Sequence, residues 1–404
     1  MVGVTLSVVL GVVVAPVFEQ LFAGAPFWPF GPLTLALTFF LAFQYVPSTY
    51  LRASQLPGRF LALTAGGFVV VVVATILLVV VLELGAAGAL LGQIASAAVV
   101  ALTTFAVLWR LRVTAVRVDL LDRALRFGLP LVPHSLSAWV LNLSDRFLIG
   151  LLTPGGPEAA QTAVGVYSFG YVLGQVVSLV AFSFNAAWVP FFYERGNEPG
   201  GPVLLREVTT LSSLGLAVLA VGIGLLAPEL TALLASDQWG AATAEAAQVT
   251  PIVALASVAY GVYYMVVSAI FLRRRVALLP VLTMVAGLVN VALNVVFIPT
   301  VGIVAAAWAT LAGYGSLALL TIWYARVVYP LDLDLPRLVV AIGGCATVLV
   351  LGTLVTLPIA GTVPGGAVHV AIGLAFAAGA VLAARGPLRR LRSLAASGPS
   401  VAVG

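Results

Sequence analysis

Polar side chains follow one side of a segment whose length suits a membrane-spanning helix. Residues 128–152 are long enough to cross a bilayer, because about 20 helical residues at about 1.5 Å each span the hydrocarbon. At about 100° per residue, its polar residues form a stripe: His134, Asn142 and Asp145 within about 80° of arc, with Ser137 and Arg146 on either side. Polar groups inside a membrane face the interior of a helix bundle or a water-filled cavity, because facing lipid costs several kcal/mol. The stripe therefore predicts a polar cavity beside this helix.

The next apolar segment, residues 164–191, carries a second polar stripe. By the same arithmetic its polar residues share about 80° of arc: Tyr167, Tyr171, Gln175, Ser178 and Asn185. Tyrosine rings and side-chain amides bind sugars by stacking and hydrogen bonding, although the same groups also hold membrane helices together. We predict that the two stripes line one cavity.

Arg146 is the sharpest candidate for a functional group, because a charge at its depth is costly. It lies about seven residues, or roughly 10 Å, from the outer end of its helix, where an unpaired charge costs about 2.5–3.5 kcal/mol. In a cavity its guanidinium would bind an anion such as a pyrophosphate or an acidic sugar. The alternative is a structural role, in which it reaches the outer interface or pairs with Asp145, Glu19 or Glu158.

Asp145 and His134 each have two interpretations as well. Asp145 either contacts the ligand or orients Arg146. His134, close to the inner end of the helix, either contacts an entering phosphate or hydrogen-bonds a carbonyl that Pro130 or Pro133 leaves without a donor. The sequence leaves both alternatives open.

The two segments together resemble the seventh and eighth helices of the polysaccharide flippases, the Wzx-like branch of the MATE-like MOP transporter superfamily. The resemblance rests on GLPLVPHSLSAWVLNLSDRFLIG at 128–150, followed by VGVYSFGYVLGQ at 164–175. Within them, Pro-His-Ser at 133–135, the Asp145-Arg146 pair and Gly-Val-Tyr-Ser at 165–168 match the family pattern. Outside this hairpin the resemblance is one of hydropathy and spacing.

The resemblance implies a fold and a function. The fold would have two pseudo-symmetric helical lobes that rock around a central cavity. The function would be translocation of a polyprenyl-pyrophosphate-linked oligosaccharide, as in O-antigen and lipopolysaccharide synthesis, from the inner to the outer leaflet of the cytoplasmic membrane. A glycan polymerase or glycosyltransferases would be its partners, beside membrane lipids.

Composition independently predicts an all-α, polytopic membrane protein. Of its 404 residues, 62% are apolar and 8% are charged, against roughly 45–50% and 25% in soluble proteins. The apolar runs do not alternate as barrel strands do, so helices are favoured. They predict twelve spans, near residues 2–22, 32–50, 60–82, 87–109, 128–152, 164–191, 207–227, 246–271, 277–298, 303–325, 337–358 and 366–384.

The basic residues predict the orientation of these spans. All 19 are arginines, and only Arg146 lies inside a predicted span. The others fall in the tail and in alternate loops on one side, so the positive-inside rule places those loops and both termini in the cytoplasm. The net charge of +5 is therefore an orientation signal, and no basic patch interleaved with aromatic residues indicates nucleic acid.

An internal repeat predicts the domain organisation. The first four spans resemble spans seven to ten, as Ala15-Pro16 and Ala227-Pro228 at equivalent ends illustrate. We expect a first lobe and linker at 1–127, a second lobe of six spans at 128–329, and two further spans with a tail at 330–404. By this repeat the first lobe lacks counterparts of two helices that the family pattern has, and the cavity lies between the lobes.

The sequence favours a transporter over an enzyme. It shows no nucleophile and base pair, no paired catalytic carboxylates and no phosphate-binding loop. One cysteine and two distant histidines predict no metal site, and we expect no cofactor. Two alternatives stay open: a cation-coupled multidrug exporter, for which the first four spans offer only Glu19 as an acidic group, and a scaffold subunit of a glycan assembly complex.

Overall fold

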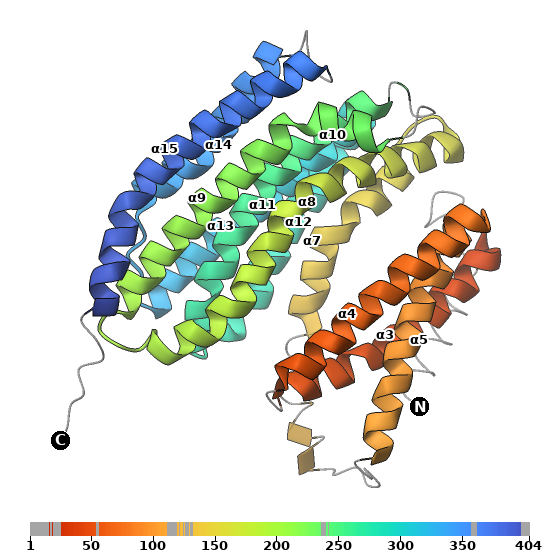
Figure 1. Ribbon diagram of the computed structural model, residues 1–404, viewed down its shortest axis with the longest axis horizontal. Helices are drawn as coiled ribbons and strands as arrows, with labels where there is room; N and C mark the ends of the chain where they lie inside the picture. Colours follow the sequence, from red (N-terminus) through yellow and green to blue (C-terminus); the bar gives the residue numbers. More distant parts are fainter. Residues whose placement is uncertain are drawn as a thin grey trace. The chain divides into compact units, whose positions relative to one another are not determined.

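The computed structural model covers the whole chain and divides it into two compact units, Met1–Phe127 and Gly128–Gly404. It describes residues 26–53, 56–110, 132–235, 242–356 and 362–396, with isolated positions at 16, 18, 119, 120, 122, 123, 125, 129 and 240. Most of the predicted first span, at 2–22, and most of the linker before residue 128 lie outside these residues. The regular elements in the described part are all helices (Figure 1), which confirms the all-α fold class.

Among the described helices of the first unit, the central one is formed by Gly85–Arg110. The unit contains α3 (Phe27–Ala53), α4 (Pro57–Thr75), which widens into a π-helical end at Ile76–Val81, and α5 (Gly85–Arg110). Helix α5 packs against both α3 and α4. The Ser96 hydroxyl of α5 donates a 2.7 Å hydrogen bond to the Gly67 carbonyl of α4, so a polar contact as well as apolar packing joins these two helices.

The second unit is organised around α11. Its described helices are α7 (Val132–Leu152), α8 (Gly156–Arg195), α9 (Gly201–Leu225), α10 (Ala227–Leu234), α11 (Ala242–Leu272), α12 (Leu279–Val301), α13 (Ile303–Val328), α14 (Leu335–Thr356) and α15 (Val363–Ala396). Helix α11 packs against α8, α9 and α13, and it is the most deeply buried of the candidate spans. Helices α14 and α15 lie along α9 at one flank of this unit (Figure 1).

Nine helices in the described part of the chain are long and apolar enough to cross a membrane. The predicted spans at 32–50 and 128–152 correspond to α3 and α7, which are not among the nine. Among the residues of α3 whose side chains the structure describes, Phe27–Phe43 form a shorter apolar helix. In helix α7 the polar residues of the stripe interrupt the apolar sequence, so contacts with other helices must contribute to its stability in a bilayer.

Helix α8 is much longer than the span that the sequence predicts. Its 40 residues correspond to about 60 Å, about twice the hydrocarbon thickness. It begins after a tight turn in which Gly155 and Gly156 have φ angles of 105° and 87°, which favour glycine. Pro157 suits the first turn, and Glu158 there and Arg195 in the last turn both complement the helix dipole.

Two glycines of α8 allow a very close approach to α11. A Cβ atom at Gly170 would lie 2.3 Å from the Ala246 carbonyl oxygen, and one at Gly174 would lie 2.6 Å from the Thr250 carbonyl oxygen. Small residues spaced four apart permit such backbone contact between membrane helices. The Thr250 hydroxyl also donates a 3.1 Å hydrogen bond to the Gly170 carbonyl, so the two helices are joined by packing and by polar contact.

Replacing Gly170 by alanine should therefore destabilise the second unit. The added methyl group has no space beside α11, and such overpacking costs about 1–3 kcal/mol. We expect a lower apparent melting temperature for purified Gly170→Ala in detergent. Gly165→Ala is the matched control, because a Cβ at Gly165 meets no atom within 4 Å. Equal melting temperatures for the two variants would contradict the close packing of α8 and α11.

Candidate functional site

The carboxylate of Asp145 is the centre of a buried polar cluster in the second unit. Its residue is fully buried. The Tyr167 hydroxyl donates to Oδ2 at 2.7 Å, the Thr310 hydroxyl donates to the same oxygen at 2.5 Å, and Asn294 Nδ2 donates to Oδ1 at 2.7 Å. These donors belong to α8, α13 and α12. A carboxylate of α7 thus binds three other helices through charge-assisted hydrogen bonds.

The cluster continues along α12. Asn290 Oδ1 accepts hydrogen bonds from the Ser144 hydroxyl at 3.0 Å and from Asn294 Nδ2 at 3.1 Å. Two buried amide atoms, Asn290 Nδ2 and Asn294 Oδ1, have no hydrogen-bond partner within the described residues. The two asparagines are four residues apart, so both face α7 from one side of α12.

A second set of polar contacts joins Asn142 to a cluster of tyrosines. The Tyr314 hydroxyl donates to Asn142 Oδ1 and lies 3.2 Å from the Tyr171 hydroxyl. The Tyr314 ring stacks on Tyr260 with centroids 4.4 Å apart, and Tyr260 packs against Tyr264 at 4.6 Å. The predicted stripe residues Asn142 and Tyr171 therefore both meet Tyr314 of α13, which in turn stacks on Tyr260 of α11.

Arg146 points to aromatic faces and not to a carboxylate. Its guanidinium carbon lies 4.3 Å from the Tyr171 ring centroid and 5.7 Å from that of Tyr167, within the range of cation–π contacts. One Arg146 nitrogen also donates to the Asn142 carbonyl at 3.4 Å. None of the ion pairs in the described part of the chain includes Arg146, and the oxygens of the adjacent Asp145 accept from other helices. The half-buried guanidinium keeps a positive charge and several N–H groups for an anion.

The remaining residues of the two predicted stripes are spread along their helices. His134 lies at the start of α7, with its side chain outside the described part of the structure, and Ser137 is half-buried one turn later. Gln175 is exposed, and Asn185 is half-buried with a buried Oδ1 that has no described partner. Asn185 is 14 residues from Tyr171, or about 21 Å along α8. The structure therefore gathers Asn142, Asp145, Arg146, Tyr167 and Tyr171, and it separates Gln175 and Asn185 from them.

Sequence reasoning missed the partners on α13. Thr310 and Tyr314 are four residues apart and share the side of α13 that faces α7 and α8. Both are buried. Two polar residues at helical spacing in an otherwise apolar span were the signal available in the sequence.

A second buried carboxylate, Glu207 of α9, also escaped prediction. Its fully buried side chain contacts Arg206 at 3.0 Å and Arg390 of α15 at 2.6 Å. Arg206 in turn pairs with Asp332 at 2.9 Å, and Arg390 lies 3.7 Å from Asp334. This network attaches the ends of α14 and α15 to α9, at the arginine-bearing end of the bundle.

The fold and these buried clusters define a multi-pass, all-helical membrane protein. Its family follows from a sequence match: the model of the family described as polysaccharide biosynthesis protein matches residues 1–244, more than half of the chain, so the chain belongs to that family. No curated protein sequence matches the chain. The family match confirms the resemblance that the motifs at 128–150 and 164–175 indicate.

A solved structure shares the fold. It is that of the lipid II flippase MurJ in an inward closed conformation, which superposes with a TM-score of 0.66 at 12% identity. The match covers 93% of this chain and 80% of the MurJ chain. The similarity supports the helical architecture over nearly the whole length of the protein.

Removing the Asp145 carboxylate should destabilise the bundle. Asp145→Ala leaves three buried donors without their acceptor, and hydrogen bonds to a charged group contribute about 1.5–3 kcal/mol each. We expect a large loss of thermal stability in detergent. Asp332→Ala is the control, because its side chain is 81% exposed and surface ion pairs contribute little. A melting temperature for Asp145→Ala close to that of the control would refute the structural role of the cluster.

Proposed function

We propose that this protein is a flippase that moves a polyprenyl-pyrophosphate-linked oligosaccharide from the inner to the outer leaflet of the cytoplasmic membrane. The product would serve the assembly of a surface polysaccharide. Membership of the polysaccharide biosynthesis family and a fold shared with a lipid II flippase support this proposal. It describes a transporter that binds and releases its substrate unchanged, in line with the absence of catalytic motifs from the sequence.

The observation that carries the proposal is that the Arg146 guanidinium has no carboxylate partner among the described residues and lies on tyrosine rings. A cation within a membrane helix is costly unless something neutralises it. The neighbouring carboxylate of Asp145 does not serve this purpose, because Tyr167, Thr310 and Asn294 occupy its oxygens. Arg146 is held on tyrosine faces, which stabilise a cation while leaving N–H groups of its planar fork available. This fork binds phosphate groups in bidentate fashion, so a pyrophosphate suits it.

The other residues of the site then have distinct roles. Arg146 and Asn142 would contact the headgroup, with Gln175, Ser137, His134 and Asn185 along the route of its sugars. Asp145, Tyr167 and Tyr171 would position Arg146, because the first two join α7 to its neighbours and the third packs against the guanidinium. In this division, the charge of Arg146 is available to the ligand, and the hydrogen bonds of Asp145 and Tyr167 hold the helices together.

A second candidate function rests on Asp145. A cation-coupled exporter of the same superfamily needs a buried acidic residue for its coupling ion, and Asp145 is fully buried. Its three donors make it a structural group in this conformation. Altered drug tolerance in a deletion strain with unchanged surface polysaccharide would favour the exporter over the flippase.

Arg146 variants test the flippase directly. Arg146→Ala should lower the rate of flipping of a lipid-linked oligosaccharide in proteoliposomes by about 10- to 100-fold, as expected for loss of charge-assisted hydrogen bonds of about 1.5–3 kcal/mol. Arg146→Lys keeps the charge without the planar fork and should have a smaller effect. Restoration of surface polysaccharide in a deletion strain should follow the same order.

The control for this experiment is Arg274→Ala, which removes an exposed arginine from the turn between α11 and α12. It should flip at the rate of the unmodified protein. Thermal stability measured on each variant separates loss of function from loss of fold. Normal flipping by a well-folded Arg146→Ala would show that the arginine only reaches an interface.

The proposed orientation places the arginine-bearing loops and both termini in the cytoplasm. Glu158→Cys and Arg274→Cys introduce thiols at exposed positions on opposite sides of the bilayer in this topology. The native Cys345 is fully buried and should react little. In intact cells, an impermeant maleimide should label position 158 and leave position 274 unlabelled until the cells are opened. Labelling of position 274 from outside would reverse the topology.

A further inference from the structure

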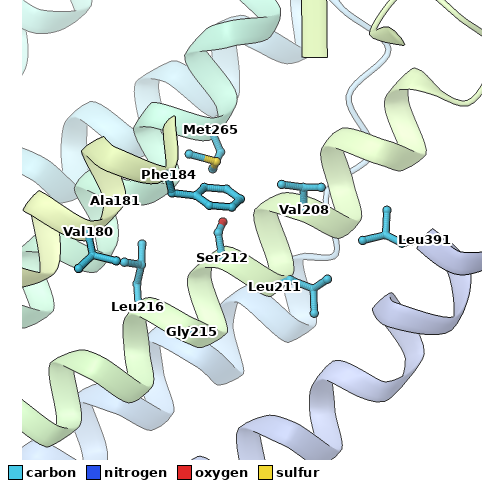
Figure 2. A pocket seen from close by; sticks show the side chains of 10 residues that line it. All are labelled: Val180, Ala181, Phe184, Val208, Leu211, Ser212, Gly215, Leu216, Met265 and Leu391. Carbon is cyan, nitrogen blue, oxygen red and sulfur yellow. The ribbon is translucent and has the colours of Figure 1, made fainter. Parts of the chain in front are cut away.

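An apolar groove lies between α8 and α9 (Figure 2), and none of the residues of the polar cluster lines it. It has a volume of about 400 Å³ and is lined mainly by aliphatic and aromatic groups, among them Phe184, Val208, Leu216 and Met265. The Ser212 hydroxyl in its wall donates to the Thr209 carbonyl of its own helix at 3.1 Å, so it has no unmet need for a polar ligand. The volume falls within the range of about 300–1,000 Å³ that is common for ligand sites.

The groove is elongated along the helices. Val208 and Leu391 lie toward one end in Figure 2, and Val180 and Leu216 lie toward the other. The eight residues from Val208 to Leu216 correspond to about 12 Å along α9. Empty apolar space loses dispersion contacts with its lining, so in a bilayer a hydrocarbon chain is the natural occupant. The shape and chemistry together indicate a single chain lying parallel to the helices.

Unpaired arginines are found beyond the Val208 and Leu391 end. At about 100° per residue Arg195 is only about 20° from Phe184 around α8, so the same face of α8 leads from the groove to this guanidinium. The Arg195 guanidinium covers the Phe191 ring at 4.8 Å. Arg392 follows directly after the groove residue Leu391 and is exposed. Neither arginine takes part in an ion pair among the described residues.

The neighbouring arginines differ from these two because their charges are already compensated. Arg206 and Arg390 both contact the buried Glu207 carboxylate, at 3.0 Å and 2.6 Å. Near this end of the groove, the exposed arginines that take part in no ion pair among the described residues are Arg195 and Arg392, together with Arg389 on the same stretch of α15. The exposed Glu194 and Glu198 flank Arg195 in the sequence, and neither forms an ion pair with it. An anionic group attached to a hydrocarbon chain matches this arrangement.

We propose that the groove binds one acyl chain of an anionic phospholipid, whose headgroup phosphate contacts Arg195 and Arg392. The predicted topology places these arginines at the cytoplasmic surface, where basic residues attract anionic lipids. The bound lipid fills the space between α8, α9 and α15 and acts as a structural or regulatory ligand.

The polyprenyl chain of the transported substrate is a less suitable occupant. Phe184 and Tyr167 are about 100° apart around α8, so the groove and the polar cluster lie on different faces of this helix. Arg195 is 24 residues from Tyr171, or about 36 Å along α8. A substrate whose pyrophosphate contacts Arg146 cannot use Arg195 for the same group. The groove is thus a separate lipid site.

Native mass spectrometry of the purified full-length protein tests this proposal. The probes are dioleoyl phosphatidylglycerol, dioleoyl phosphatidylcholine and a polyprenyl phosphate, each titrated in the same detergent. We expect one phosphatidylglycerol to bind at least about 10-fold more tightly than phosphatidylcholine, which is a difference of about 1.4 kcal/mol. The double variant Arg195→Gln/Arg392→Gln should lose this preference, and Arg274→Gln should retain it.

A pair of variants on α9 isolates the groove itself. Gly215→Phe places a ring in the groove, and Gly222→Phe adds the same ring on the same helix outside it. A Cβ at either glycine meets no atom within 4 Å, so neither change forces the backbone. Gly215→Phe should weaken phosphatidylglycerol binding at least about 10-fold, and Gly222→Phe should bind it like the unmodified protein.

Three results would overturn the proposal. Equal affinity of the unmodified protein for the two phospholipids would remove the role of the arginines. Unchanged phosphatidylglycerol binding by Gly215→Phe would place the lipid elsewhere. Displacement of phosphatidylglycerol by the polyprenyl phosphate, with loss of polyprenyl binding in Gly215→Phe, would assign the groove to the substrate chain. Because the readout is lipid binding, none of these results depends on whether the protein flips an oligosaccharide.

Discussion

The buried carboxylate of Asp145 is the constraint on which the second unit depends. In a bilayer a carboxylate without water must obtain its hydrogen bonds from protein groups, and here they come from α8, α12 and α13. Together with the contacts of Ser144 and Asn142, these bonds fix the rotation and depth of helix α7. Arg146, the next residue, is directed about 100° away and meets the tyrosine faces of α8. A structural interaction thus determines where the candidate ligand-binding charge is presented.

Much of this arrangement could be predicted from sequence, because helical periodicity and hydropathy are local properties. The stripe of Asn142 and Asp145 and that of Tyr167 and Tyr171 follow from spacing alone, and the structure brings these residues together. The partners of Asp145 could not be predicted in this way, because Asn294 and Thr310 lie 149 and 165 residues further along the chain. Their choice depends on how α12 and α13 pack beside α7.

The ion pairs of the buried Glu207 were the other feature that could not be predicted from the sequence. Glu207 follows Arg206 near the start of α9, a position where a charged residue is usually exposed, yet Glu207 is fully buried. It is paired by Arg390, which is 183 residues away on α15. The ends of the helices were also not predictable from hydropathy. Helices α8 and α15 continue well past the predicted apolar segments, because charged residues such as arginine are compatible with a helix.

The length of α8 has a mechanical consequence. A continuous helix of about 60 Å acts as a lever, so a tilt of about 10° about one end displaces the other by about 10 Å. The backbone contact at Gly170 and Gly174 prevents α8 from tilting without α11. Rocking of this unit should therefore move α11 together with the part of α8 that carries the aromatic rings under Arg146, whereas Pro190, which removes a helical hydrogen bond, separates this part from Arg195.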